Sequence, residues 1–436
     1  ITAEDFLFTY DMFMADSNLV NSRYPYDQFA SVEAPDDTTV VITFDDPFAP
    51  WLATVFTEVL PEHVLAPVFE DEGSLDNAAW NRDASVSSGP YVLSEWEVGS
   101  FARFDRNENY YNGTPNLDTV LIRFVPDSET LLATLLNGEA EFATFISYAD
   151  VPSLEEAGFV PQIVNSGYNE QWFLNVREGL GHPSLQDIRV RQALVLAFDR
   201  FSITEDLLNG LTYPADSYWE GSPYDNPDIE APPYDPEAAA ALLDEAGWVD
   251  SDGDGIRDQE IDGELVPLNL RYITNTRQIR VDVQAVVQQS FANLGIGVEL
   301  INYPSDQYFN GYAAGGPIAI GDYDIAELST TGSFPDPNTT QFLCSEIPTD
   351  ESPDGNNEIG YCNEEVDALF EQANSTTDTN ARIELFHQID QILTDDVAFV
   401  GVWYDPDLWV VDGSVENAAV NGATPYWNAA QWAVSE

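Results

Sequence analysis

The sequence predicts an α/β protein with more than one domain. Short runs of β-branched and aromatic residues, bounded by turn formers, alternate with amphipathic stretches at helical spacing, and this alternation is typical of mixed layers of strands and helices. The chain has 436 residues, of which 44% are hydrophobic. It is therefore long enough for about three domain-sized units, or for two large lobes that each have their own core.

The first part of the chain predicts one helix followed by strands. The chain opens in an amphipathic helix with Thr2 as a candidate N-cap, as if in the middle of a domain, so we expect the natural N-terminus to lie upstream. Strand-like runs follow at 38–44, 89–96 and 117–125, and residues 101–115 predict a strand that is followed by a turn. The next helix begins at residue 128, and Gly138 can end it.

Residues 187–200, with the sequence DIRVRQALVLAFDR, predict a helix that has Asp187 as its N-cap. Its apolar residues recur at the spacing of one buried face: Val190, Ala193, Leu194, Ala197 and Phe198. Three arginines share this short segment, and Arg189 and Arg191 lie off the buried face, beside loops rich in carboxylates. We interpret these arginines as scaffold residues that tie the helix to acidic neighbours.

The chain is strongly acidic. It has 77 acidic residues against 14 basic ones, all of them arginine, for a formal net charge of −63. This charge repels phosphate backbones and anionic lipid surfaces, so we expect no nucleic-acid partner. It is typical of a hydrated surface in salty surroundings, where screening weakens self-repulsion, and with the absence of lysine it favours a halophilic or marine source. No apolar run reaches the length of about 18 residues that a membrane span needs.

The second half of the chain continues the alternation of helices and strands. Asp235 and Pro236 begin a helix, and Gly247 can end it. Further helices are predicted at 277–295, 363–374 and 379–396, and further strands at 268–274, 296–302 and 398–405.

An Asp/Gly-rich turn, residues 250–258, has part of the spacing of a calcium-binding loop. Aspartates occupy positions 1, 3, 5 and 9 and a glycine position 6: Asp250, Asp252, Asp254, Asp258 and Gly255. Position 12, which needs a bidentate glutamate, is Ile261. A bound calcium ion is one interpretation and a solvated turn is the other, which we favour. We expect no other cofactor.

The two cysteines, Cys344 and Cys362, lie on either side of a loop rich in Pro, Asp, Gly and Asn. We predict a disulfide between them, with two free buried thiols as the alternative. A disulfide would indicate a location outside the cytoplasm.

The sequence lacks the patterns of known catalytic sites. The histidines His63, His182 and His387 lie in no metal-binding or nucleophile motif. Neighbouring acids such as Asp45 and Asp46 are frequent by chance in so acidic a chain. We therefore expect a protein without catalytic activity, and a secreted hydrolase that uses a carboxylate pair is the weakest alternative.

Six segments in order resemble the extracytoplasmic solute-binding proteins of family 5, the oligopeptide- and dipeptide-binding class that serves ABC importers. The segments are TAEDFLFT at 2–9, residues 87–111, WFLNV at 172–176, residues 187–200, the helix and Asp/Gly turn at 238–258, and FPDPNTTQFLC at 334–344. In that family the first of these segments follows several dozen residues, which agrees with a missing front.

This resemblance implies a two-lobed α/β fold of the periplasmic-binding-protein type II, with an extra subdomain, a hinge between the lobes and the N-terminal part absent. It assigns residues 1–85 to a remnant of the extra subdomain, 86–168 to lobe I, 169–400 to lobe II and 401–436 to a return to lobe I. It also implies a monomeric, extracytoplasmic substrate-binding component, either periplasmic or lipid-anchored at the cell surface. Such a component would deliver a peptide-like solute to an ABC permease, and an oligosaccharide is the alternative ligand.

The resemblance also places candidate ligand contacts. They are Tyr168, Gln171, Trp172, Tyr308, Thr331, Gly332, Ser333, Asp336, Trp403 and Tyr404. In peptide-binding relatives an aspartate at the position of Ser333 captures the α-amine of the ligand. Either Asp336 replaces it here, or the ligand lacks an amine. For each aromatic residue, core packing is the alternative.

Overall fold

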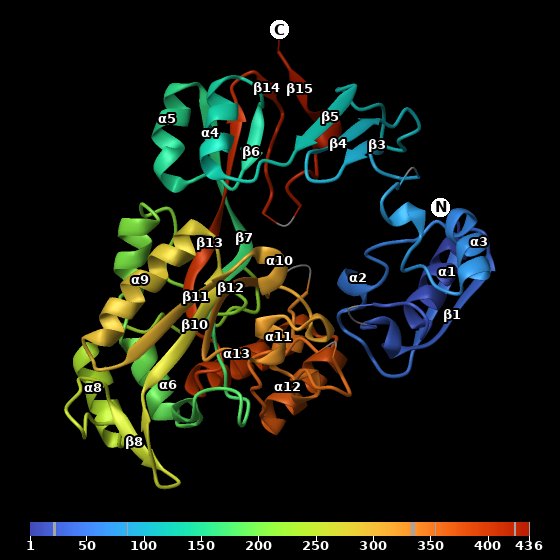
Figure 1. The fold of residues 1–436 in the computed structure, drawn as a ribbon. Helices are drawn as coiled ribbons and strands as arrows, with labels where there is room; N and C mark the ends of the chain where they lie inside the picture. The colour runs from blue at the N-terminus through green and yellow to red at the C-terminus, as the bar shows by residue number, and fades with distance from the viewer. Residues whose placement is uncertain (21–22, 85, 333–335, 354, 423, 436) are drawn as a thin grey trace. The chain divides into compact units, whose positions relative to one another are not determined.

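The computed structural model describes the chain except residues 21–22, 85, 333–335, 354, 423 and 436, and except the side chains of 165 and 166. Its helices and strands alternate, as the sequence predicts (Figure 1). Unit 1 comprises Ile1–Ser166 and Pro406–Glu436, and unit 2 comprises Gly167–Asp405. The lobe boundaries expected at 86, 169 and 401 stay predictions.

The N-terminal part of unit 1 is a small helical cluster beside a strand pair. Its elements are α1 (Ala3–Met14), α2 (Trp51–Thr54), α3 (Glu62–Glu72), β1 (Phe29–Asp36) and β2 (Thr39–Phe44). The predicted cap of α1 is confirmed, because the Thr2 backbone N–H donates to Asp5 Oδ2 at 2.7 Å. The apolar face of α1, with Phe8 and Met12, packs against Leu65 of α3.

The rest of unit 1 contains an antiparallel sheet in the order β3-β4-β5 and further short elements. Their bounds are β3 (Tyr91–Glu97), β4 (Phe101–Arg106), β5 (Thr119–Arg123), α4 (Ser128–Leu136), β6 (Phe142–Thr144), α5 (Val151–Glu156), β14 (Val415–Glu416) and β15 (Ala433–Val434). The predicted end of α4 is confirmed, because Gly138 follows it with a φ of 68°. Leu135 of α4, Leu154 of α5 and Val410 are buried together in one core.

The main sheet has the order β11-β10-β12-β7-β13-β6. Its long strands are β7 (Phe159–Leu174), β10 (Asn269–Asn275), β11 (Gly297–Tyr303), β12 (Ile325–Thr331) and β13 (Gly401–Asp412). Strands β10, β11 and β12 run parallel to one another, and β7 is antiparallel to β12. The chain passes between the two units within β7 and again within β13.

Helices cover both faces of the sheet in unit 2 (Figure 1). They are α6 (Ile188–Leu196), α8 (Pro236–Glu245), α9 (Gln278–Ala292), α12 (Glu364–Ser375) and α13 (Thr379–Asp395). On one face, Phe291 of α9 packs edge-on against Trp172 of β7. On the other face, Phe173 and Ile273 share a buried cluster with residues of α12 and α13. Adjacent strand residues therefore serve opposite cores, as the pleat requires.

The arginines of residues 187–200 are scaffold residues, as predicted, but within the described part of the chain only Arg189 bonds a carboxylate, and that carboxylate is the N-cap of its own helix. Asp187 caps the helix, and Arg189 forks onto its two oxygens, with Nε at 3.0 Å and NH2 at 2.5 Å. Arg191 donates instead to the backbone carbonyl of Asp396 at 2.7 Å, and Arg200 to that of Pro232 at 2.6 Å. Arg191 therefore bonds a backbone carbonyl and not the carboxylate that was predicted for it, because helix and loop ends supply carbonyl oxygens that need donors.

The Asp/Gly turn precedes a hairpin of β8 (Asp258–Ile261) and β9 (Glu264–Pro267). The carboxylates of Asp250, Asp252 and Asp254 are exposed and have oxygens within 4.8 Å of one another. Asp258 is buried and its Oδ2 accepts the Ser251 N–H at 3.0 Å. Ion binding by this loop stays a prediction.

The predicted disulfide between Cys344 and Cys362 is confirmed. The two cysteines are 18 positions apart in the sequence, and the bond closes the loop between them.

Replacing both Cys344 and Cys362 by serine should lower the free energy of unfolding by about 3 kcal/mol, because an open loop raises the conformational entropy of the unfolded chain. Urea titration of the variant and the parent measures the difference. A reducing agent should produce a similar loss in the parent and none in the variant. Equal stabilities of parent and variant would contradict the prediction.

Candidate functional site

The candidate site is the edge of the unit-2 sheet at which three parallel strands end. Strands β10, β11 and β12 end there at Asn275, Tyr303 and Thr331. Antiparallel β7 enters at the same edge, because Tyr168 lies opposite Thr331. Ligands of open α/β sheets bind outside the carboxyl ends of the strands. We call this part of unit 2 the carboxyl edge.

The carboxyl edge presents exposed aromatic rings beside neutral polar groups. Tyr168 is 44% exposed, and Phe309 is 50% exposed just after the short helix α10 (Ser305–Tyr308). The Asn275 amide donates to Ser305 Oγ at 3.1 Å. Aromatic faces with a few polar groups are the usual lining of small-molecule sites.

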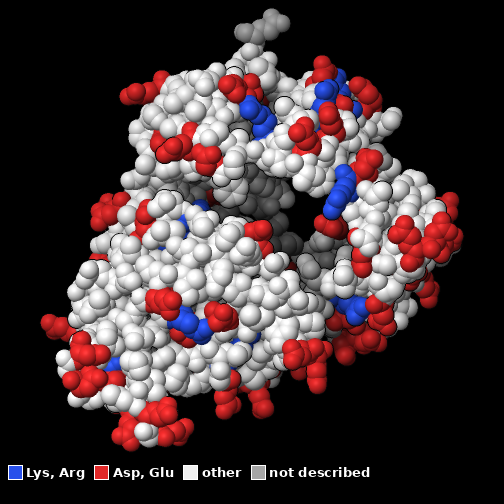
Figure 2. All heavy atoms as spheres, viewed as in Figure 1, with Lys and Arg blue, Asp and Glu red and all other residues white. Residues whose placement is uncertain are grey.

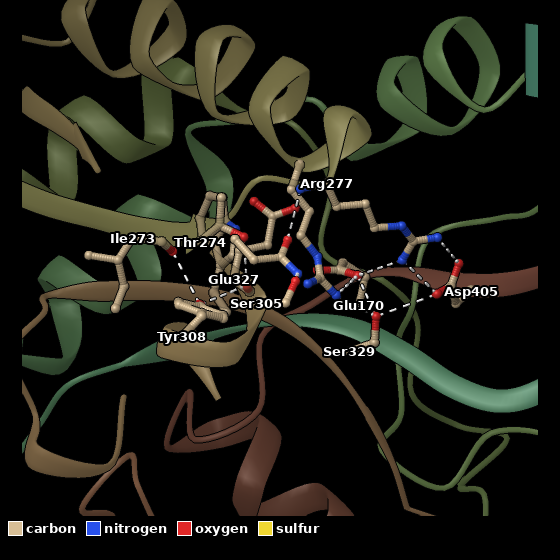
Figure 3. Close-up of polar contacts among 12 residues, drawn as sticks. Glu170, Ile273, Thr274, Arg277, Ser305, Tyr308, Glu327, Ser329 and Asp405 are labelled. Carbon is tan, nitrogen blue, oxygen red and sulfur yellow. Dashed lines mark hydrogen bonds and ion pairs between the residues drawn. The ribbon is translucent and has the colours of Figure 1, made fainter. Parts of the chain in front are cut away.

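Five charged or hydroxyl side chains form a connected network at this edge (Figure 3). They are Glu170, Arg277, Arg280, Ser329 and Asp405, and we call them the edge cluster. Arg280 forks onto the fully buried Glu170, with Nε at 2.7 Å from Oε1 and NH2 at 3.0 Å from Oε2. Arg277 forks onto Asp405 at 3.0 Å and 3.3 Å. Two cations therefore meet two anions, and the buried carboxylate is compensated.

A second buried network adjoins the edge cluster. Trp172 Nε1 donates to the Tyr272 hydroxyl at 2.8 Å, and this hydroxyl donates to Glu327 Oε2. Glu327 is completely buried. Burial, and then the negative charge of Glu170, raise the pKa of the Glu327 carboxyl well above its usual value. The folded protein therefore holds a proton on Glu327 more tightly than the unfolded chain does.

The predicted residues Gln171 and Trp172 face opposite sides of the sheet. Gln171 accepts a hydrogen bond from Gln341 Nε2 at 3.0 Å, on the side opposite to α9. Trp172 packs against Phe198 on the other side, with ring centroids 4.1 Å apart. Both side chains are fully covered within unit 2, and contact with a ligand stays a prediction for each.

Other predicted contact residues are buried inside unit 2. The Tyr308 hydroxyl donates to the Glu327 carbonyl at 2.8 Å, and Trp403 is 1% exposed. The Tyr404 hydroxyl donates to Asp216 Oδ1 at 2.7 Å, which ties β13 to the loop that precedes α8. Ligand contact by these side chains stays a prediction.

The segment after β12 contains Ser333, at the position of the amine anchor in peptide-binding relatives, and Asp336, the candidate replacement for that anchor. Ser333 lies outside the described residues. Asp336 forms a fork with Arg382, with its two oxygens at 2.6 Å and 2.7 Å from the guanidinium nitrogens. Gly332 lies against Tyr218, where an added Cβ would collide with the carbonyl and the ring. The Asp336 carboxylate is thus already neutralised by a scaffold arginine.

Sequence reasoning missed the charged members of the edge cluster. Glu170 stands two positions before the apolar run of residues 172–174, and an acid beside such a run indicates a buried partner. Arg277 and Arg280 are three positions apart, so they lie on neighbouring positions of one helix face. These two signals together could have suggested that Glu170 pairs with the arginines at 277 and 280.

The family model of bacterial extracellular solute-binding proteins, family 5, matches residues 1–345. The chain belongs to this family. It is 26% identical to the oligopeptide-binding protein AppA of Bacillus subtilis over 456 aligned residues, which cover 99% of this chain and 77% of AppA. It is 24% identical to the dipeptide-binding protein of Escherichia coli, with 91% of this chain and 72% of the relative aligned.

Solved structures share the fold. The structure of Bacillus subtilis AppA in complex with a nonapeptide matches with a TM-score of 0.84 and 26% identity, over 100% of this chain and 84% of the other. Campylobacter jejuni NikZ in complex with Ni(L-His) matches with a TM-score of 0.85 and 22% identity, over 99% and 84%. The periplasmic-binding-protein-like fold predicted from the sequence is therefore confirmed. Among the described residues, no helix combines the length and apolarity that a membrane crossing needs.

Replacing Glu327 by glutamine should change how stability depends on pH. The folded protein keeps a proton on Glu327 at pH values where the unfolded chain has lost it, so the free energy of unfolding falls as pH rises above the ordinary value of 4.5. One such group contributes a slope of at most about 1.4 kcal/mol per pH unit.

Glu327→Gln should remove this slope and be more stable than the parent at pH 7, as measured by urea titration between pH 5 and 8. Glu129→Gln, at an exposed position of α4, is the control that should keep the slope of the parent. If the free energy of unfolding depended on pH in the same way for the parent and for Glu327→Gln, this would contradict the raised pKa of Glu327.

Proposed function

We propose that the protein is the substrate-binding component of an ABC importer, that it captures a peptide-like solute by a hinge movement of its two units, and that it delivers this solute to a membrane permease. The observation that carries this proposal is the match of residues 1–345 to a family of extracellular solute-binding proteins, together with the similarity of the chain to an oligopeptide-binding protein that has been solved with a nonapeptide bound. Binding that favours one arrangement of the units shifts the population towards it. The permease then recognises the ligand-bound arrangement of the units.

The connectivity of the chain supports a hinge. Only β7 and β13 carry the chain between the two units. A rotation of one unit therefore requires backbone changes at few residues, which is the usual design of hinge proteins.

The chemistry of the carboxyl edge fits the body of a peptide better than its charged ends. The acids Glu170, Asp405 and Asp336 are each paired with an arginine. The rings of Tyr168 and Phe309 are exposed. We infer that unit 2 recognises the ligand through apolar and neutral polar contacts.

An oligosaccharide is the second candidate ligand. The exposed rings of Tyr168 and Phe309 offer faces that could stack on sugars as well as on peptide side chains. We propose no catalytic step for either ligand, in keeping with a solute-binding family.

We further propose that the protein works outside the cytoplasm as a monomer, either in a periplasm or anchored by lipid to the cell surface. The family is extracellular, and the disulfide is consistent with an oxidising compartment.

A peptide should raise the melting temperature, because a ligand specific for the folded state stabilises it by about 2.7 kcal/mol at a hundredfold excess over Kd. The test is differential scanning fluorimetry with a library of peptides of two to nine residues and, in parallel, a panel of oligosaccharides. For the best peptide, the N-acetylated form should bind nearly as well as the free form, because Asp336 is held by Arg382. A large loss on acetylation would contradict this expectation, and a shift with sugars alone would favour the second candidate.

Salt should stabilise the protein. Carboxylates recur across the face shown in Figure 2, with few arginines among them, and we propose that this surface is adapted to a saline medium. The screening length falls from about 10 Å at 0.1 M salt to about 3 Å at 1 M, so repulsion between these carboxylates weakens. The melting temperature should therefore rise between 0.1 M and 2 M KCl. An unchanged or lower melting temperature would contradict the adaptation.

A further inference from the structure

The two strands that link the units carry unusual residues at the crossing points. Gly167 is the first residue of unit 2, and its φ of 73° lies in the left-handed region that favours glycine. Pro406 is the first residue of the returning segment of unit 1, and it lies inside β13 without an N–H group to donate to the sheet. Both strands are therefore locally adapted to bend where the chain crosses.

The edge cluster lies immediately inside unit 2 from these two points. Glu170 is on β7 close to Gly167, and Asp405 is the residue before Pro406. Arg277 connects the two strands, since its guanidinium is 3.0 Å from Asp405 Oδ2 and 3.9 Å from Glu170 Oε2. Figure 3 shows the Arg277 side chain beside the carboxylates of Glu170 and Asp405.

Ser329 connects the same strands through a third one. Its Oγ is 2.6 Å from Glu170 Oε2 and 3.4 Å from Asp405 Oδ2, and it accepts a hydrogen bond from Arg280 NH2 at 2.8 Å. Strand β12, which carries Ser329, pairs with β7. Every polar atom of the Glu170 carboxylate therefore has a partner.

The arginines are mounted on a rigid support. They lie at the start of α9, whose residues Val283, Val287 and Phe291 are completely buried. Glu170 and Arg280 are themselves buried, so separating them would leave a buried charge without compensation. This pair therefore resists separation.

We propose that the edge cluster is a clamp that fixes β7 and β13 where they enter unit 2, and that it confines the hinge to Gly167 and to the Asp405–Pro406 bond. Arg277 and Arg280 are thus positioning residues: they set the range of hinge movement through the strands, without contact with the ligand. This inference rests on the proposed function, of which the hinge movement is a part.

The test is the distribution of distances between the units in the ligand-free protein. Spin labels on cysteines at two exposed positions, Glu129 in unit 1 and Glu384 in unit 2, report it by pulsed electron resonance. The two native cysteines are bonded to each other and do not take the label. Arg277→Gln should broaden and shift the distribution.

Arg271→Gln is the matched control. The Arg271 side chain is 31% exposed, as that of Arg277 is, and it pairs with Asp322 and Asp324 at the opposite end of β10. Arg271→Gln should lower the stability of the protein about as much as Arg277→Gln does, and it should leave the distribution of distances between the units unchanged. Equal distributions for the parent and Arg277→Gln, or equal changes in both variants, would overturn the clamp.

Three further variants keep the test decisive. Asp405→Asn should reproduce the effect of Arg277→Gln, and the double variant should add little, because both remove one pair. If Arg277→Gln does not fold, Arg277→Lys keeps the charge but loses the fork and should broaden the distribution to a smaller extent.

Different results would refute the clamp and the proposed function. Because the distances are measured without ligand, an absence of peptide binding would refute the function and leave the clamp intact. A parent protein that binds peptide, with Arg277→Gln indistinguishable from it, would refute the clamp alone.

Discussion

The carboxylate of Glu170 is held in the interior of unit 2, and the local structure is arranged around its compensation. A buried charge is tolerated only when a partner is fixed in place, and here the partner is the first turn of α9. That turn is positioned because β10 ends just before it, and the register of β10 with β11 and β12 determines where β10 ends. The same register brings the strand ends together at the carboxyl edge. The packing of the sheet, the ion pairs and the candidate site therefore depend on one another.

Glu327 extends this dependence to the face beneath α9. It lies near Glu170, and the interior compensates the Glu170 carboxylate with arginines, whereas burial and the charge of Glu170 raise the pKa of Glu327. Trp172 and Tyr272 form a chain of hydrogen bonds that ends at Oε2 of this acid. Oε1 of Glu327 is buried without a hydrogen-bond partner among the described residues, so the interior does not fully compensate this carboxyl group.

Much of the fold could be predicted from the sequence, because the signals were local. Asp187, Asp235 and Gly138 stand at the predicted helix ends, and the disulfide joins the only two cysteines. The partners of Arg191 and Arg200 could not be predicted, since the carbonyl groups that they bond lie on distant loops. The site was harder still: Gln171 and Trp172 are neighbours in the sequence, yet the pleat directs them into different cores. Pairings such as Glu170 with Arg280 bring together residues 110 positions apart, and only the tertiary structure shows them.

Unit 2 is one uninterrupted stretch of chain placed inside another, the topology of an inserted domain. Its first and last residues, Gly167 and Asp405, belong to adjacent strands of its own sheet. Domains whose termini lie near one another are the ones that tolerate transplantation and circular permutation. The segment 167–405 is accordingly a natural module for excision, and new termini could be opened in a surface loop once the old ones are joined by a short linker.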